Sequence, residues 1–352
     1  MSESPGRLLL YAPSVHTGGG LVLLKELLSA WQAGVPLVAW LDNRARDQIS
    51  LPPLAQVRWV RARVSSRLAA EWSLRRAAGT VDRVLCFHGL PPLLNSRARI
   101  EVFQQNINYF GNVQLETFQW GVRQRLWFEQ ALCRWRRHRV QRYWVQTPSM
   151  AEALRRWWGP ESGRLDVQVL AFMPPTPYGD QLADVRSDHD FIYVADGAAH
   201  KNHRRLIEAW IHLAERGVRP SLALTLSPRD HLLQEWIDAR SKQHGLRIHH
   251  LGTLPHSQLL GHYSRARALI FPSLGESFGL PLLEAQARNC PIVASERDFV
   301  RDVCRPLHTF DPLSSVSIAR AVLRFLGQPE QPVQPVDGGM FLEALGIVPP
   351  RA

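Results

Sequence analysis

The sequence predicts an α/β protein built from two doubly wound parallel sheets. Short apolar runs, bounded by Gly, Pro or Asp, alternate along the whole chain with amphipathic stretches of helix length. Such runs are typical of parallel strands that are buried on both faces and joined by crossover helices. The length of 352 residues, 45% of them hydrophobic, is sufficient for two separate cores. A Pro-rich break divides the runs into two series, which favours two domains.

We expect nine strands in these two series. The first series is Leu8–Tyr11, Leu37–Trp40, Val84–Phe87, Glu101–Gln104 and Tyr143–Gln146; the second is Phe191–Val194, Leu222–Leu226, Ala268–Phe271 and Pro291–Ala294. Met173–Pro177 and the polar run Asp180–Asp190 separate the series. The predicted organisation is a Rossmann-like domain over residues 1–171, a linker over 172–189, a second such domain over 190–327 and a tail over 328–352. The tail is predicted to hold one short helix at Met340–Leu345.

The net charge of +11 belongs to the N-terminal half of the chain. Residues 1–170 hold 23 Lys and Arg against 12 Asp and Glu, whereas the remainder holds 19 of each. A basic protein with aromatic residues is typical of nucleic-acid binding. However, the sequence carries no helix-turn-helix, zinc-finger or RNA-binding motif, so nucleic acid is not the expected partner.

Location is predicted from the same composition. No window approaches 18 consecutive apolar residues, and Met1–Gly6 shows no signal-peptide pattern. The four cysteines are widely spaced, which suits reduced thiols rather than disulfides or a zinc ribbon. We expect a cytoplasmic protein, with peripheral association at the inner face of the cytoplasmic membrane as the alternative that its basic half favours.

The segment PSLGESFGLPLLEA, residues 272–285, is the most specific pattern. An apolar strand enters a loop with Ser277, and a helix is predicted to begin near Leu280. The loop amides of Phe278, Gly279 and Leu280 would then lie at a positive helix end, which suits a phosphate or diphosphate. Glu276 and Glu284 would face the same crevice and accept hydrogen bonds from sugar or ribose hydroxyls. The alternative is a capped helix with solvated acids.

The second pattern is DGAAHKN, residues 196–202, directly after the predicted strand FIYVA. A lysine that precedes a helix at the end of a strand is well placed to pair with a diphosphate. Lys201 is also one of only three lysines in an arginine-rich chain. A solvated helix N-terminus would explain the pattern equally well.

Together these segments resemble the donor domain of the family 4 glycosyltransferases, which are retaining enzymes of the GT-B fold. The resemblance covers roughly residues 190–327 and rests on KN at 201–202, LGTLPHSQLLGHYSRARALIFPS at 251–273, the E-x7-E element, CPIVAS and FDP at 310–312. It implies two doubly wound Rossmann-like domains facing across a cleft. It also implies that Lys201 holds the donor diphosphate, Glu276 contacts the donor sugar, Glu284 contacts the ribose and Leu254 lines the base pocket.

The N-terminal half is similar to the same family more loosely. Gly18, Gly19 and Gly20 open a predicted helix and let the backbone approach a ligand closely. The resemblance places such a glycine loop near the donor phosphates, whereas a tight turn without a ligand is the alternative.

The chain departs from the family pattern at two positions. Many members carry a histidine where this chain has Gln104, Gln105 and Asn106, and an arginine where it has Ala198. Asn106, His88 and His16 are the candidates to replace the histidine, with Asn106 ranked first. For either histidine, a side chain that is merely hydrogen-bonded in a loop is the competing interpretation.

No metal or other cofactor is expected. The single DxD, Asp188-His189-Asp190, precedes a predicted strand instead of following one at the mouth of a pocket. The GT-B resemblance also fits metal independence, because Lys201 and the helix-end amides can neutralise a diphosphate.

Residues 120–143 hold seven arginines and one acid. On a helix, Trp120, Trp127, Phe128, Ala131, Leu132 and Trp135 form one arc with arginines on both sides. Trp127, Arg134 and Arg137 are therefore candidates for a membrane or acceptor surface. The alternative is a crossover helix whose apolar face packs on the sheet, with its arginines solvated. A mixed case, with the helix buried and its arginine rim facing lipid headgroups, also stays open.

These patterns predict a retaining, metal-independent glycosyltransferase of the hexosyltransferase type. It would move a sugar from a GDP- or UDP-linked donor to a hydroxyl of a glycan acceptor, expected to be lipid-linked, in bacterial surface polysaccharide or lipopolysaccharide synthesis. The alternatives are a non-catalytic GT-B-fold nucleotide-sugar binding protein and a GT-B-like epimerase or phosphorylase. The sequence leaves open the donor base and sugar, the acceptor, the linkage and the oligomeric state.

Overall fold

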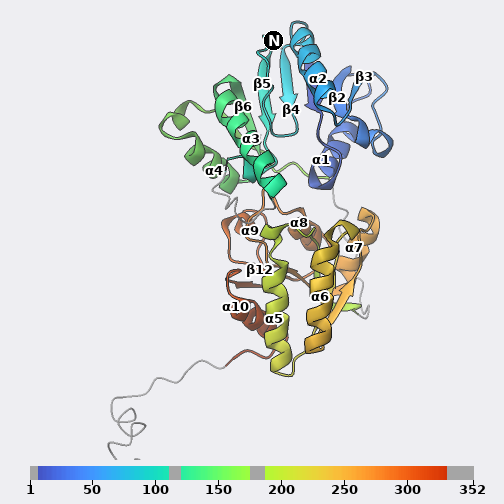
Figure 1. Ribbon diagram of the computed structural model, residues 1–352, viewed down its shortest axis with the longest axis vertical. Coiled ribbons are helices and arrows are strands. Elements are labelled where there is room, and N and C mark those ends of the chain that lie inside the picture. The colour runs from blue at the N-terminus through green and yellow to red at the C-terminus, as the bar shows by residue number, and fades with distance from the viewer. Residues whose placement is uncertain (1–6, 111–119, 175–186, 331–352) are drawn as a thin grey trace, which may run out of the picture.

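The computed structural model describes residues 7–110, 120–174 and 187–330. Two parallel β-sheets come from separate parts of the chain, one from residues 8–169 and the other from residues 189–310. Figure 1 shows them as an upper and a lower body, each with helices packed around its sheet. The predicted fold class, α/β with two parallel sheets, is confirmed.

The N-terminal sheet has seven parallel strands in the order β3-β2-β1-β4-β5-β6-β7. Its strands are β1 (Leu8–Ala12), β2 (Leu37–Asp42), β3 (Ala55–Val60), β4 (Arg83–Cys86), β5 (Arg99–Phe103), β6 (Val140–Val145) and β7 (Val167–Val169). Its helices are α1 (Gly18–Ser29), α2 (Val64–Ala77), α3 (Trp120–Arg136) and α4 (Pro148–Trp158), with the short 3-10 turns η1 (Asn43–Gln48), η2 (Ile107–Tyr109), η4 (Arg137–Arg139) and η5 (Pro160–Arg164).

The central strand β1 is buried on both faces. Because successive side chains of a strand point to opposite faces, its apolar run supplies two cores. Leu9 and Tyr11 pack with α2, α3 and α4, whereas Leu10 and Ala12 pack with α1. Three helices therefore cover one face of this sheet and α1 covers the other.

The C-terminal sheet has six parallel strands in the order β10-β9-β8-β11-β12-β13. Its strands are β8 (His189–Tyr193), β9 (Ser221–Leu224), β10 (Arg247–His250), β11 (Ala266–Phe271), β12 (Ile292–Ser295) and β13 (His308–Phe310). Its helices are α5 (His203–Glu215), α6 (His231–His244), α7 (His256–Arg265), α8 (Leu280–Ala287), α9 (Asp298–Arg301) and α10 (Ser315–Phe325), with the turns η6 (Ala199–Lys201) and η7 (Pro228–Asp230).

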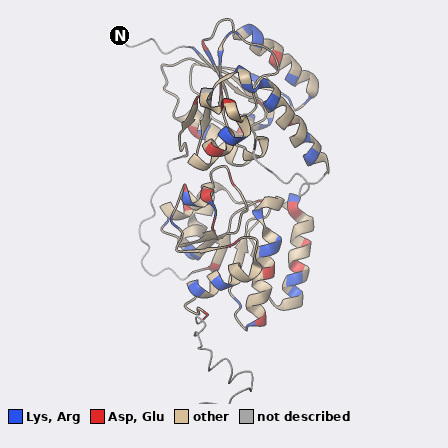
Figure 2. Ribbon diagram, turned by 90° about the vertical axis from the view of Figure 1, so that its left-hand side faces the viewer, with Lys and Arg blue, Asp and Glu red and all other residues tan. Residues whose placement is uncertain are grey.

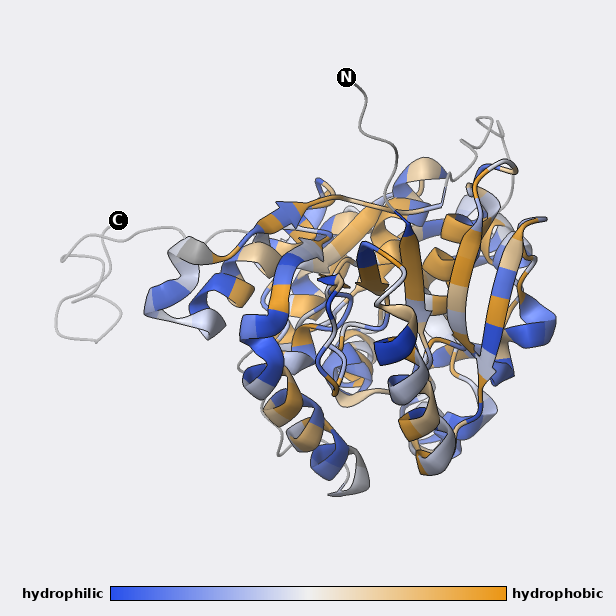
Figure 3. Ribbon diagram, turned by 90° about the horizontal axis from the view of Figure 1, so that it is seen from above, coloured by the Kyte–Doolittle hydropathy of each residue, from blue (hydrophilic) through white to orange (hydrophobic). Residues whose placement is uncertain are grey.

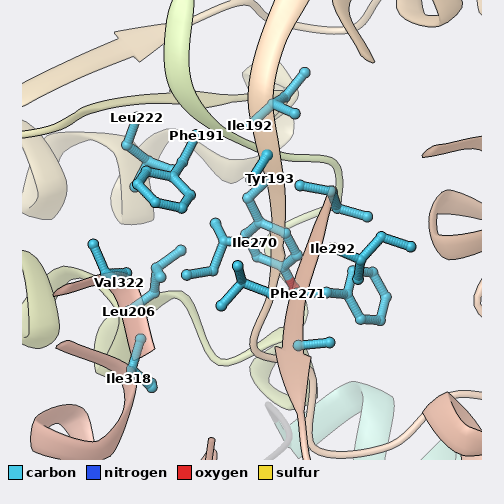
Figure 4. Close-up of a cluster of buried hydrophobic side chains, with 14 of the residues drawn as sticks. Phe191, Ile192, Tyr193, Leu206, Leu222, Ile270, Phe271, Ile292, Ile318 and Val322 are labelled. Atoms are coloured by element: carbon cyan, nitrogen blue, oxygen red, sulfur yellow. The ribbon is translucent and has the colours of Figure 1, made fainter. Parts of the chain in front are cut away.

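One continuous hydrophobic cluster holds this second domain together. Phe191 and Tyr193 of β8, Ile270 and Phe271 of β11 and Leu206 of α5 all belong to it, and Figure 4 shows them converging. In Figure 3 the strands are mostly orange, whereas the helices around them are banded in blue and orange. The pattern is that of sheets buried between amphipathic helices.

All nine predicted strands are present, but four further strands, β3, β7, β10 and β13, were not predicted. These four are the outer strands of the two sheets. The segments AQVRWV and RIHH show the reason, since their side chains are largely half-buried or exposed. An edge strand lacks cover on both faces and therefore lacks the continuous apolar run on which the prediction depended.

Of the two predictions about connecting segments, one can be compared with the structure and the other cannot. The predicted linker ends too late, because β8 already begins at His189. Asp190 lies within that strand, where it accepts hydrogen bonds from the backbone N and Oγ of Ser221. The helix predicted at Met340–Leu345 lies outside the described residues, and so does most of the Pro-rich stretch.

The strand order of each sheet reverses beside a central strand, between β1 and β4 in the first sheet and between β8 and β11 in the second. Ligands of open α/β sheets bind at such points, outside the carboxyl ends of the strands. The loops that follow β1, β4, β8 and β11 contain Gly18, His88, Lys201 and Glu276. The topology therefore brings predicted site residues of both domains to switch points.

Candidate functional site

The loop over residues 272–279 connects β11 to α8 and is held by buried polar contacts. Ser273 is completely buried, and its hydroxyl donates to Glu276 Oε1 at 2.6 Å. Its carbonyl accepts from Ser295 Oγ at 2.9 Å, and the next amide, Leu274 N, donates to the carbonyl of His200 at 2.8 Å. These bonds connect the loop to β12 and to the loop after β8, so its conformation is fixed from two sides.

Helix α8 begins at Leu280, as the sequence predicts. Gly279 before it has a φ of +82°, and a Cβ there would lie 3.0 Å from Leu282 Cδ1. The positive φ strongly favours glycine at this position, and a Cβ would also crowd the Leu282 side chain. The first amides of a helix have no carbonyl partner within the helix, so the start of α8 is a suitable site for an anion.

Lys201 ends the turn η6 and is positioned by its neighbours. Its carbonyl accepts from Tyr193 Oη at 2.7 Å. Asn202 follows in the left-handed conformation, with a φ of 64°, and its Nδ2 donates to the carbonyls of Pro272 at 3.1 Å and Pro312 at 2.7 Å. The side-chain amide of Asn202 thus brings the KN, PSLGES and FDP segments together in space.

The predicted Lys201 and Glu276 lie in direct contact. Lys201 Nζ is 2.7 Å from Oε1 and 2.9 Å from Oε2 of Glu276. Both side chains are largely shielded from solvent, at 17% and 12% exposed. A cation and a carboxylate from loops 75 residues apart therefore form one charged pair beside the start of α8.

Glu284 forms a separate cluster with α7. Its carboxylate accepts from Tyr263 Oη at Oε2, 3.0 Å away, and lies 3.0 Å from His256 Nε2 at Oε1. The hydrogen bond to Glu284 raises the pKa of His256, and burial raises that of Tyr263 well above its usual value. Neither partner was predicted from the sequence. Their spacing of seven residues, two helical turns, places them on one face of α7 and could have indicated them.

The glycine loop of the N-terminal domain lies against the start of α8. Gly18 opens α1 with a φ of +63°. A Cβ on Gly19 would lie 3.4 Å from Leu280 Cδ1, and one on Gly20 would lie 3.1 Å from Gln105 Oε1. The N-termini of α1 and α8, which carry positive ends of helix dipoles, therefore approach each other across the two domains.

The QQN segment after β5 also reaches the second domain. The amide of Ile107 donates to Ser277 Oγ at 3.0 Å. Asn106 beside it is half-buried, and its Oδ1 accepts from the amide of Asn108 at 3.0 Å. Asn106 thus lies one residue from a direct contact with the E-x7-E loop.

The two candidate histidines are both engaged in local contacts. His88 Nδ1 lies 3.2 Å from the carbonyl of Tyr11, and its ring meets the Tyr11 ring edge-on at 5.3 Å. Burial lowers the pKa of His88 to about 4. His88 is therefore neutral at pH 7, and a carbonyl partner assigns its proton to Nδ1. His16 Nδ1 lies 3.2 Å from the carbonyl of Ser14 and 3.8 Å from Asp42.

Leu254 is half-buried in the loop between β10 and α7, two residues before His256. Within the described parts of the chain, no group of three or more His, Cys, Asp or Glu side chains is arranged to hold a metal ion. Asp188 and Asp190 of the DxD pair with Arg265 and Arg267, at the start of β8. All four cysteines are buried free thiols.

Helix α3 does not pack as one sequence interpretation expected. Its buried residues are Leu126, Cys133 and Arg136, whereas Trp127 and Arg134 are exposed. The interpretation in which the tryptophan arc packs on the sheet is therefore wrong. Arg137 is also not part of a free rim, because it donates to the carbonyl of Trp158 at 3.3 Å and lies over the Trp158 ring.

The second domain matches a known family model. Residues 180–339 match the family model described as "Glycosyl transferases group 1". The C-terminal domain is therefore similar to the group 1 glycosyltransferases. The match includes the KN segment, the E-x7-E loop and FDP, whose contacts form the cluster described above.

Two mannosyltransferases of Escherichia coli match parts of the chain. O-antigen chain mannosyltransferase B is 32% identical over 108 residues, 30% of this chain and 28% of that protein. The serotype-specific mannosyltransferase WbdA is 37% identical over 75 residues, 21% of this chain and 9% of that protein. The chain thus spans less than a third of the length of either curated relative.

Similarity to solved structures extends over both domains. Anabaena Alr3699/HepE, in complex with UDP and glucose, has a TM-score of 0.66 at 14% identity and covers 92% of this chain and 90% of its own. Sucrose-phosphate synthase from Thermosynechococcus elongatus has a TM-score of 0.65 at 18% identity with the same coverage. The predicted GT-B architecture is confirmed, and its two parallel-sheet domains have seven and six strands.

Proposed function

We propose that the protein is a retaining glycosyltransferase, of the family 4 type, that moves a sugar from a nucleotide diphosphate donor to a hydroxyl of a glycan. The observation that carries the proposal is the Lys201–Glu276 pair, which lies beside the start of α8 in a region that matches the group 1 glycosyltransferase model. A cation, a carboxylate and free helix-end amides are the groups that a diphosphate attached to a sugar requires.

In this proposal the donor lies along the second domain. Lys201 and the amides of Phe278, Gly279 and Leu280 offset the diphosphate charge, and Gly18 and Gly19 supply a second helix end facing it. Metal independence is part of the proposal, because these groups provide positive charge at the position of the leaving phosphate. The UDP and glucose bound by Alr3699/HepE support a nucleotide-sugar donor, and the mannosyltransferase relatives keep a GDP-linked donor in consideration.

The two carboxylates, Glu276 and Glu284, would recognise the sugar and the nucleoside, respectively. Glu276 can accept hydrogen bonds from sugar hydroxyls only through the lone pairs that Lys201 does not occupy. The ion pair with Lys201 therefore also orients the carboxylate toward the sugar. Glu284 accepts hydrogen bonds from the ribose hydroxyls, which replace its hydrogen bond with His256. Leu254 contacts the base. The clusters around Lys201 and around Glu284 thus divide the donor into a diphosphate-sugar part and a nucleoside part.

Retention of configuration is proposed to follow from front-face attack. The acceptor hydroxyl oxygen forms the new bond to the anomeric carbon on the face from which the phosphate departs. The bond between that carbon and the phosphate oxygen breaks, and the acceptor proton passes to the leaving phosphate. Lys201 stabilises the charge that develops on that phosphate.

Asn106 is proposed to hydrogen-bond the sugar or the acceptor. Its neighbour Ile107 contacts Ser277, so the segment is already at the E-x7-E loop. His88 is a weak candidate for a general base, because a pKa of about 4 leaves it little tendency to take up a proton at neutral pH. A neutral His88 can still accept a hydrogen bond through Nε2.

The acceptor is proposed to be a lipid-linked glycan of bacterial surface polysaccharide or lipopolysaccharide synthesis, which the partial similarity to O-antigen chain mannosyltransferase B supports. No helix in residues 7–110, 120–174 or 187–330 combines the length and hydropathy that crossing a bilayer requires. A chain of this kind would meet a lipid-linked acceptor from one side of the membrane, at the cytoplasmic face.

The test is sugar transfer by the purified protein from UDP- and GDP-linked hexoses to a panel of glycan acceptors, with the anomeric configuration of the product read by NMR. Transfer with retention supports the proposal. Binding without turnover indicates the non-catalytic alternative, phosphate-dependent cleavage indicates a phosphorylase, and rearrangement of the sugar without an acceptor indicates an epimerase. Any of these three results would overturn it.

A further inference from the structure

The outward face of α3 is apolar and aromatic. Trp120, Trp127, Phe128 and Trp135 are each between 58% and 74% exposed. At 3.6 residues per turn they share one side of the helix, opposite the side on which Leu126 and Cys133 are buried. Trp127 meets Phe128 edge-on, and the Arg136 guanidinium lies 5.1 Å from the centre of the Trp135 ring, but all four aromatic side chains remain largely open to solvent.

Helix α2 presents a similar stripe. Val64, Leu68 and Trp72 follow one another at intervals of four residues and are between 49% and 77% exposed. Its buried side is formed by Ala70 and Leu74. Residues four apart lie above one another on a helix, so the three side chains form a continuous apolar line on the outside of the domain.

Both helices belong to the same layer of the N-terminal domain. Ala70 and Leu74 of α2 pack in the same hydrophobic cluster as Leu126 and Cys133 of α3. The loop 92–94 joins them, because Glu71 Oε2 accepts from the amide of Leu93 and Arg136 Nε donates to the carbonyl of Pro92. Leu93 is itself exposed. The two stripes, with Leu93, form what we call the α2–α3 face; Figure 1 shows both helices on the upper body.

On both helices the acidic side chains face inward and the exposed charged side chains are basic. Each helix contains one acid, and both acids turn inward: Glu71 is buried, and Glu129 is 21% exposed and paired with Arg125. The exposed charged side chains are arginines, namely Arg67, Arg75 and Arg76 on α2 and Arg123, Arg125 and Arg134 on α3. Figure 2 marks such basic positions in blue along the helices of this domain.

We propose that the α2–α3 face docks on the surface of a bilayer that contains anionic phospholipid. Indole rings and aliphatic side chains favour the boundary between headgroups and acyl chains, and arginines at their sides can pair with lipid phosphates. A second copy of this chain would bring like charges together. A nucleic acid would use the arginines but would gain nothing from the exposed Val64, Leu68 and Leu93.

This inference is independent of the proposed function, because lipid binding is measured without a nucleotide sugar. The experiment is co-sedimentation of the full chain with vesicles of phosphatidylcholine alone or mixed with phosphatidylglycerol, at moderate salt. We expect strong preference for the mixed vesicles. Quenching of tryptophan fluorescence by brominated acyl chains should show that the rings enter the boundary region.

Two matched pairs of variants separate the apolar from the charged contribution. Arg123→Gln with Arg134→Gln should weaken binding about thirtyfold, since each basic residue near the surface contributes about 1 kcal/mol. Trp127→Ser with Trp135→Ser should reduce quenching, because only Trp72 and Trp120 of this face remain, and should weaken binding at least about tenfold. The controls are Arg247→Gln with Arg305→Gln and Leu232→Ser with Leu313→Ser, all exposed positions of the second domain. All these positions are exposed, so thermal unfolding should remain cooperative in each variant.

Four outcomes would overturn the proposal. Equal binding to neutral and mixed vesicles would remove the role of the arginines. Effects no larger than those of the controls would move the binding site elsewhere. Tight binding of DNA or RNA that depends on the arginines but not on the tryptophans would assign the face to nucleic acid, and a concentration-dependent dimer lost in the tryptophan variant would assign it to self-association.

Discussion

Lys201 Nζ lies within 2.9 Å of both carboxylate oxygens of Glu276, and Ser273 donates a third hydrogen bond to the same carboxylate. The pair joins the loop after β8 to the loop after β11, at the point where the strand order of the second sheet reverses. Because both side chains are largely shielded, each controls the position of the other. A diphosphate that enters this site must therefore share Lys201 with Glu276.

Glu276→Gln should separate sugar recognition from diphosphate binding. The amide cannot hold Lys201 by charge, so the lysine becomes more available to phosphate, while the contact with the sugar is weakened. We expect transfer to fall by about one hundredfold, on the scale of a lost transition-state contact, while nucleoside diphosphate binds at least as tightly as before. Steady-state kinetics and calorimetry measure the two effects. Glu235→Gln, an exposed acid of α6, is the control.

Weaker binding of the nucleoside diphosphate to Glu276→Gln would contradict this account of the pair. It would mean that Glu276 acts mainly by holding Lys201 in place rather than by contacting the sugar.

The His256–Glu284 contact should make stability depend on pH above neutrality. Glu284 raises the pKa of His256 above its ordinary value of 6.5. A group with a raised pKa in the folded state contributes fully below pH 6.5, and its contribution disappears as the pH rises through the folded value. Compared with wild type, His256→Gln should lower the melting temperature at pH 6 and have little effect at pH 9.

A melting temperature of His256→Gln that falls by the same amount at both pH values would exclude a charged histidine. The histidine would then act as a neutral side chain, through packing and a hydrogen bond to Glu284. The pH dependence of the other groups is the same in both proteins and cancels in the comparison.

His203 should destabilise the protein in acid. It is buried at the start of α5, its ring lies 4.8 Å from the Tyr193 ring, and burial lowers its pKa to about 4. The unfolded chain therefore binds a proton near pH 6.5 that the folded chain resists, so stability falls as the pH falls from 6.5 to 4. The loss from this group reaches about 3 kcal/mol. Chemical denaturation at pH 4.5 and 7 should show a smaller difference for His203→Phe than for wild type.

His88 has the same sign of pH dependence, since its pKa is also lowered to about 4. The stability that the protein loses in acid should therefore be only partly restored in His203→Phe. An unchanged acid loss would show that His203 does not remain neutral in the folded protein.

Asn106 and His88 should differ in their effect on transfer. Asn106 lies beside the contact between Ile107 and Ser277, whereas the Nδ1 atom of His88 contacts the Tyr11 carbonyl. We expect Asn106→Ala to lower kcat about tenfold or more through a lost hydrogen bond, with a smaller effect for His88→Gln. A larger loss for His88→Gln, with a pH profile that shifts in that variant, would reverse the ranking.

The sequence predicted the centre of each sheet but not its edges. The run LLLY could be recognised because β1 is buried on both faces, whereas RIHH of β10 is largely exposed and has no apolar pattern. The loop positions of Lys201 and Glu276 could be predicted because parallel strands bring their carboxyl ends to one edge. The contact of Glu284 with His256 and Tyr263 could not, because it depends on how α7 packs against α8.

The sequence also could not predict which side of α3 packs on the sheet and which side faces outward. Its aromatic arc fits equally well against a sheet or toward a membrane, and periodicity alone cannot distinguish the two. The orientation of α3 follows from the side on which Leu126, Cys133 and Arg136 are buried. Arg136 can be buried there because it donates hydrogen bonds to the Pro92 carbonyl and to Asn95 Oδ1. A buried arginine on the inner side is a tertiary feature that the apolar pattern does not report.

The most direct test of the account is calorimetric binding of UDP, GDP and their hexose derivatives to wild type, Lys201→Ala and Lys242→Ala. Lys242 is an exposed lysine of α6 and serves as the matched control. We predict that wild type and Lys242→Ala bind one of the nucleotide sugars equally well, and that Lys201→Ala weakens that binding by about ten- to one-hundredfold through the lost charge-assisted contact. Equal binding by all three proteins would contradict the assignment of the diphosphate to Lys201.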